Sequence, residues 1–125
     1  MTDIKYLNPG TPVAGPYTPG VLAGNILFIS GQGPKQGLTT IEDQTYSTLE
    51  NIKSIVKVTG GTTKNIVNIM VFLSNIKDFA KMNKTYKKFF DDNDMFENYP
   101  ARTTVEVSNL PIADMLIEIN AIAVL

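Results

Sequence analysis

The sequence predicts an α+β fold of two layers, in which two helices pack on one face of a mixed sheet. Residues 39–61 and 75–90 repeat apolar side chains at helical spacing, and short apolar runs of strand length precede, separate and follow them. The predicted order is β-β-α-β-α-β-β. A chain of 125 residues has the size of one domain, so residues 1–125 are expected to form a single one.

The first twenty residues contain four prolines and are expected to be extended loop. Residues 21–30 hold two short apolar runs on either side of Gly24-Asn25, which predicts a β-hairpin. Residues 31–37, with three glycines and a proline, are expected to form a loop.

The first helix is predicted to begin with a capping box of Thr39 and Glu42, whose side chains satisfy free backbone donors. Gly60-Gly61 ends it. Its apolar face consists of Ile41, Thr45, Leu49, Ile52, Ile55 and Val56.

Residues 65–74 are apolar on both faces apart from Asn68, which predicts a central strand covered on both sides. Ser74 or Asn75 caps the second helix. Its end is expected near Phe90, because the acidic residues that follow are unfavourable at a helix C-terminus. The predicted core face of this helix consists of Phe79, Met82, Tyr86, Phe89 and Phe90.

A strand from Arg102, a turn over residues 108–114 and a last strand over 115–125 complete the fold. On the sheet face away from the helices, Ile66, Met70 and Phe72 are too apolar for water. They predict self-association through the sheet.

Composition narrows the possible functions. The chain has no cysteine and no histidine, which excludes disulfides, thiol nucleophiles, Ser-His triads and His- or Cys-ligated metal sites. Acid-base chemistry must therefore come from carboxylates, Tyr, Lys or ordered water. No segment approaches the roughly 20 apolar residues of a membrane span, and the start lacks a secretory signal. We therefore expect a cytoplasmic protein without a membrane partner.

Charge argues against a nucleic-acid partner. The net charge is −1, whereas nucleic-acid binders usually carry a basic surplus. The one basic cluster is followed at once by acidic residues, so it is expected to be a solvated helix face. Its members are Lys81, Lys84, Lys87 and Lys88.

Two charged residues occupy unusual places in the predicted strands. Arg102 opens an otherwise plain strand, and Glu118 stands in an apolar row of the last strand, where desolvation costs several kcal/mol without a partner. A hairpin between these strands would bring Arg102 and Glu118 near each other, although register decides whether they share a face. A functional site, a salt bridge and a subunit-interface ion pair all fit these facts.

Three weaker candidates are Asn83, Tyr17 and the segment of residues 30–33. Asn83 borders the apolar stripe of the second helix and also fits a surface position. Tyr17 lies between turn residues, where its hydroxyl lines a pocket or caps a loop. The segment "SGQG" offers backbone N–H groups that bind an anion or belong to an ordinary loop.

The order of these features resembles the Rid family (RidA/YjgF, formerly grouped with the L-PSP endoribonucleases). The resemblance covers nearly the whole chain. Its most specific motif, P-A-R-[ST]-x-V-x-V followed by L-P and I-E-x-x-A-I-A, stands here as "PARTTVEV", "LP" and "IEINAIA". It implies a chorismate-mutase-like fold of the bacillus type and a homotrimer with clefts between subunits.

The resemblance also implies a reaction that needs no cofactor and no metal: hydrolysis of 2-imino acids or their enamines, of the 2-aminoacrylate and 2-iminobutanoate type, to 2-keto acids and ammonia. The alternatives are an endoribonuclease or translation inhibitor, and a non-catalytic trimer that binds a small carboxylate.

By the same resemblance, Arg102 binds the substrate carboxylate and Glu118 positions the hydrolytic water. The remaining substrate-binding positions are Tyr17, Ser30, Gly31, Asn83 and Thr104. The chain departs from many relatives at two positions, with Thr104 in place of a cysteine and Pro19 in place of a glutamine.

Overall fold

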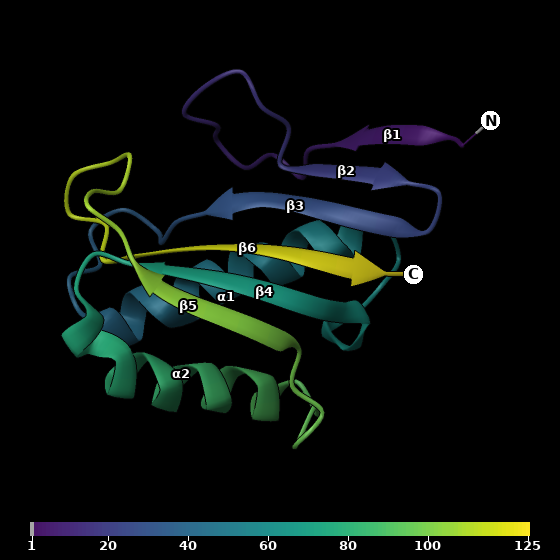
Figure 1. Ribbon diagram of the computed structural model, residues 1–125. Coiled ribbons are helices and arrows are strands. Elements are labelled where there is room, and N and C mark those ends of the chain that lie inside the picture. Colours follow the sequence, from purple (N-terminus) through teal and green to yellow (C-terminus); the bar gives the residue numbers. More distant parts are fainter. Residues whose placement is uncertain (1) are drawn as a thin grey trace.

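The computed structural model describes residues 2–125 (Figure 1). In this range six strands form one sheet in the order β1-β2-β3-β6-β4-β5, and two α-helices pack against it. The α+β fold predicted from the sequence is confirmed. The strands are β1 (Ile4–Leu7), β2 (Gly20–Ala23), β3 (Ile26–Gln32), β4 (Ile66–Leu73), β5 (Ala101–Glu106) and β6 (Ile117–Val124), and the helices are α1 (Ile41–Val58) and α2 (Phe79–Asp92).

The N-terminal segment contains a strand that the sequence analysis assigned to loop. β1 pairs antiparallel with β2 and lies at one edge of the sheet. It precedes the prolines, which occupy the segment between β1 and β2. The element order is therefore β-β-β-α-β-α-β-β, one strand longer than predicted.

The expected hairpin between the last two strands is wrong. β5 pairs in parallel with β4, and β6 pairs antiparallel with β4 on its other side, so β4 separates β5 from β6. The reason is α2, which returns the chain to the end of the sheet where β4 begins (Figure 1). A strand that follows such a crossover runs parallel to its predecessor.

The first helix starts one residue later than predicted. The side chain of Thr40 accepts a hydrogen bond from the Asp43 backbone N–H at 3.1 Å, so Thr40 rather than Thr39 is the cap. The helix ends at Val58, and Gly60 adopts a φ of 85° that favours glycine. Every member of the predicted apolar face of this helix is buried.

The second helix runs two residues past its predicted end at Phe90. Lys87 pairs with Asp91 at 2.6 Å and Lys88 pairs with Asp92 at 2.8 Å, each four residues along the helix. These pairs offset the unfavourable acidic charge at the C-terminus. The predicted core face is confirmed except for Phe79, which is 40% exposed and lies near Arg102.

The two faces of the sheet differ in cover. Both helices lie on one face, where β4 buries Ile69, Val71 and Leu73 (Figure 1). On the other face Met70 and Phe72 are only half-buried, so β4 is covered on one side within the chain. Ile66 was expected on this open face. It is 3% exposed and belongs to the core, because the pairing of β4 with β6 shifts register just after it.

None of the helices formed by residues 2–125 has the length and apolar character needed to span a membrane.

Candidate functional site

Arg102 points from β5 into the helix layer. Arg102 pairs with Ile69 of the neighbouring strand β4, and Ile69 is fully buried against the helices. The guanidinium carbon is 4.7 Å from the centre of the Tyr86 ring and 5.7 Å from that of Phe79. Nη1 donates a hydrogen bond to Met82 Sδ at 3.9 Å. Arg102 forms no salt bridge with any residue from 2 to 125.

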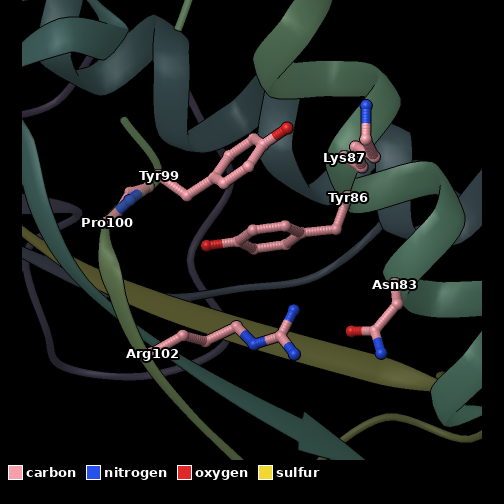
Figure 2. A pocket seen from close by; sticks show the side chains of 6 residues that line it. All are labelled: Asn83, Tyr86, Lys87, Tyr99, Pro100 and Arg102. Atoms are coloured by element: carbon pink, nitrogen blue, oxygen red, sulfur yellow. The ribbon is translucent and has the colours of Figure 1, made fainter. Parts of the chain in front are cut away.

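A crevice of about 310 Å³ opens beside this arginine, between α2 and β5 (Figure 2). Figure 2 shows the guanidinium reaching from β5 toward α2, with the carbonyl oxygen of Asn83 turned toward it. Lys87 and Tyr99 lie at the other end of the lining, where both bind Asp91. The lining consists of Asn83, Tyr86, Lys87, Tyr99, Pro100 and Arg102.

Buried polar atoms without partners gather around Arg102. In the part of the chain that the structure describes, Asn83 Oδ1, the Tyr86 hydroxyl and Thr104 Oγ1 are buried without a hydrogen bond. Thr104 lies two residues after Arg102 on the same face of β5. Burial raises the pKa of Tyr86, and Arg102 opposes this shift. Each such atom costs about 1–3 kcal/mol while it has no hydrogen-bond partner.

Glu118 belongs to the open face of the sheet. It lies opposite Phe72 of β4, between two fully buried residues of β6, Ile117 and Ile119. The side chain is half-buried, and burial raises the pKa of its carboxyl above the ordinary value. No hydrogen bond or ion pair joins this carboxyl to another residue in the range 2–125.

Gly31 makes room for this carboxyl. A Cβ atom at Gly31 would lie 2.8 Å from the carboxyl carbon of Glu118 and 3.2 Å from its Cγ. Contacts under 3.0 Å require one of the two groups to move. A glycine is therefore needed for Glu118 to keep its position.

The segment before Gly31 is tied to the N-terminal loop. Ser30 Oγ donates to the Thr18 carbonyl at 2.6 Å, and Ser30 N–H donates to the Pro19 carbonyl at 2.9 Å. Pro19, which stands where many relatives have glutamine, makes this contact through its backbone carbonyl. Because every amino acid has this group, the proline does not remove the contact. Tyr17 is 45% exposed, and its hydroxyl accepts from the Ala14 N–H at 3.1 Å. It caps its own loop, which is one of the two roles considered for it.

The predicted site residues thus fall into two groups. Arg102 and Asn83 line the crevice on the helix side, and Thr104 follows Arg102 on the same face of β5, whereas Gly31 and Glu118 meet on the open face. The prediction that a hairpin brings Arg102 and Glu118 near each other is wrong for a single chain. The two residues lie on opposite faces of the sheet.

Sequence reasoning missed part of the crevice. It assigned Tyr86 to the core, and Lys87, Tyr99 and Pro100 to no site. A signal for Tyr86 was present, because it follows Asn83 by three residues and so lies on the same helix face.

Comparison with known proteins gives a consistent result. A family model described as Endoribonuclease L-PSP matches residues 10–125. A RutC family protein of Pyrococcus horikoshii is 42% identical over 129 residues, which cover 98% of each chain. TdcF of Escherichia coli, which is described as a candidate reactive intermediate deaminase, is 41% identical over 115 residues, covering 88% of this chain and 87% of TdcF.

Solved structures share the fold. The crystal structure of E. coli TdcF with bound serine has a TM-score of 0.87 and 38% identity, covering 96% of this chain and 97% of that one. The E. coli YjgF gene product has a TM-score of 0.85 and 40% identity, covering 94% of both chains.

Proposed function

The chain belongs to the Rid family (RidA/YjgF), the family that the Endoribonuclease L-PSP model describes, and on this premise we propose that it is a hydrolytic deaminase of 2-imino acids. Its products would be a 2-keto acid and ammonia, and its substrates imines or enamines of the 2-iminobutanoate and 2-aminoacrylate type. The observation that carries the proposal is a half-buried arginine that faces a crevice and has no carboxylate partner in residues 2–125.

Arg102 is suited to the carboxylate of such a substrate. A planar guanidinium binds a carboxylate through two parallel charge-assisted hydrogen bonds, which lysine cannot reproduce. Arg102 is the only arginine in the chain, so this mode of binding has one possible location. The serine bound to TdcF has a carboxylate beside a nitrogen-bearing carbon, as a 2-imino acid does, which supports this substrate class.

Glu118 is suited to activate water. As the water oxygen attacks the imine carbon, the carboxylate accepts a proton from the water, and the resulting carbinolamine holds both oxygen and nitrogen. The carboxylate returns its proton to the nitrogen, and the hydroxyl proton also passes to the nitrogen as the C–N bond breaks, so that ammonia leaves and the C=O bond of the keto group forms. The raised pKa of Glu118 makes its carboxylate a better proton acceptor than an ordinary glutamate.

The two residues can act together only across an interface between chains, because they lie on opposite faces of one sheet. We therefore place each site between Arg102 of one subunit and Glu118 of its neighbour in a homotrimer. The apolar open face supports this assembly. Phe28 is 48% exposed on it, and Ile26, Val105 and Val124 are exposed there too.

A coupled assay tests the proposal. A threonine dehydratase generates the imine, and release of 2-ketobutyrate is followed with and without the protein. We expect wild type to accelerate release, and Arg102→Ala and Glu118→Gln each to lose about 100-fold of that acceleration. Arg102→Ala also loses affinity for 2-ketobutyrate, whereas Glu118→Gln keeps it. Glu42→Gln, an exposed carboxylate elsewhere, is the matched control.

Three outcomes would contradict the proposal. Unchanged release by both variants would refute the site. Wild type that degrades single-stranded RNA without accelerating imine hydrolysis would be a ribonuclease. Wild type that binds 2-ketobutyrate without accelerating hydrolysis would be a non-catalytic binding protein.

A further inference from the structure

The positive charge of Arg102 lies against aromatic rings and a thioether. Its guanidinium carbon is within 6 Å of two ring centres, those of Tyr86 at 4.7 Å and Phe79 at 5.7 Å. Its one side-chain hydrogen bond within residues 2–125 goes to the sulfur of Met82 at 3.9 Å. All three contacts come from consecutive turns of α2.

These contacts stabilise the cation without neutralising it. A ring attracts a cation through its quadrupole, and a thioether is a weak acceptor, so neither competes strongly for the guanidinium N–H groups. A carboxylate of the same chain would instead bind those N–H groups in the geometry that a substrate needs. The aromatic contacts therefore fix the direction of the side chain and leave its hydrogen-bonding edge available.

The ring of Tyr86, and not its hydroxyl, makes the contact with Arg102. The hydroxyl is buried and has no hydrogen-bond partner among the residues that the structure describes. A tyrosine whose only role was structural would normally use its hydroxyl when buried. In the described residues, Tyr86 therefore contacts Arg102 through its ring and not through its hydroxyl.

We infer that Tyr86, assisted by Phe79, is a positioning residue that holds Arg102 in place for the carboxylate of the substrate. This inference rests on the proposed function only in taking Arg102 as the carboxylate-binding group. Holding the guanidinium in advance lowers the entropy lost when the carboxylate binds. The effect therefore belongs to binding, and so to KM rather than to kcat.

Core packing is the competing explanation for Tyr86, because its ring also lies 4.7 Å from the Phe90 ring. Tyr86→Leu removes both contacts and lowers stability. Phe79→Leu separates the two explanations, because Phe79 is 40% exposed and contributes less to the core than Tyr86 does. Tyr86→Phe restores the ring without the unpartnered hydroxyl.

Affinity for 2-ketobutyrate, measured by calorimetry on the folded full-length protein, is the first readout. We expect Tyr86→Leu to weaken binding by about 5- to 30-fold and Phe79→Leu by about 2- to 3-fold. Tyr86→Phe should restore affinity to near that of wild type. Phe96→Leu, an exposed aromatic outside the crevice lining, is the matched control.

Modification of the single arginine gives a second readout that does not need activity. Phenylglyoxal reacts with guanidinium groups, so its uptake reports on Arg102 alone. We expect 2-ketobutyrate to protect Arg102 in wild type and Tyr86→Phe. Equal protection of the Tyr86→Leu protein would require a 2-ketobutyrate concentration higher by the same 5- to 30-fold.

The outcomes separate this inference from the proposed function. Wild-type affinity in both Tyr86→Leu and Phe79→Leu would overturn the positioning role even if imine hydrolysis is confirmed. Equal weakening in Tyr86→Phe and Tyr86→Leu would overturn it as well, because the hydroxyl would then be responsible. Graded weakening in a protein that hydrolyses no imine would support the positioning role and refute the deaminase.

Discussion

The helix-side crevice holds the positive charge of Arg102, and the open face of the sheet holds the negative charge of Glu118. The two charges differ in how far their own chain covers them. Arg102 is enclosed by groups of its own chain, whereas Glu118 lies on a face that the chain leaves uncovered. Had both residues shared one face, they would neutralise each other in a salt bridge. Their separation by the sheet leaves each charge without an opposite partner in residues 2–125, and available to a ligand or a neighbour.

The largest expected effect comes from mixing two impaired proteins. Arg102→Ala and Glu118→Gln are each expected to lose about 100-fold of the acceleration. If every site combines Arg102 of one chain with Glu118 of another, refolding an equal mixture restores about one quarter of the wild-type sites, because half of the chains carry each intact residue. Imine hydrolysis before and after mixing measures this recovery.

The double variant Arg102→Ala/Glu118→Gln mixed with wild type is the control, since it creates no new intact site. A mixture that recovers no activity although mass spectrometry shows mixed trimers would mean that both residues act within one chain.

A smaller effect on activity is expected when Gly31, which leaves space for the Glu118 carboxyl, is replaced by alanine. In Gly31→Ala the new methyl group displaces the Glu118 carboxyl, and kcat/KM falls at least about tenfold because the water is misplaced. Stability should change little, since the end of a flexible side chain can move. Gly33→Ala is the matched control, because its methyl would lie 2.7 Å from Met115 Cε, outside the proposed site. Full activity in Gly31→Ala would refute the role of this glycine.

The smallest effect concerns pH and the carboxyl of Glu118. Burial raises its pKa, so folding favours the protonated form. This contribution to stability is fully present below the unfolded pKa and is lost as the pH rises through the folded pKa. In an Arg102→Ala background, where no guanidinium remains, Glu118→Gln should raise Tm at pH 7 and have little effect near pH 4. A lower Tm at pH 7 would show that the carboxylate has a favourable partner.

Local patterns in the sequence predicted most of the elements but not their pairing. The spacing of apolar residues in 41–56 identified the buried face of α1, and the run 65–74 identified β4. The position of β5 depends on α2, a crossover whose direction no local pattern records. The hairpin prediction failed for that reason, and with it the expected proximity of Arg102 and Glu118.

The candidate site was only partly accessible to sequence reasoning. Arg102 and Glu118 stood out because charges are rare in such surroundings, Asn83 and the segment with Gly31 were weaker candidates, and the family resemblance added Thr104. Tyr86 was hidden, because a buried aromatic residue on a helix fits the core equally well. Its contact with a cation is a property of the packed structure.

The bond from Ser30 to the Pro19 carbonyl has an evolutionary consequence. Position 19 contributes to the wall beside Gly31 through a main-chain oxygen, which is present whichever amino acid occupies the position. Mutations can therefore exchange the side chain there while Ser30 keeps its anchor. Related proteins could diversify this position, and with it the approach to the site, at little cost to the architecture.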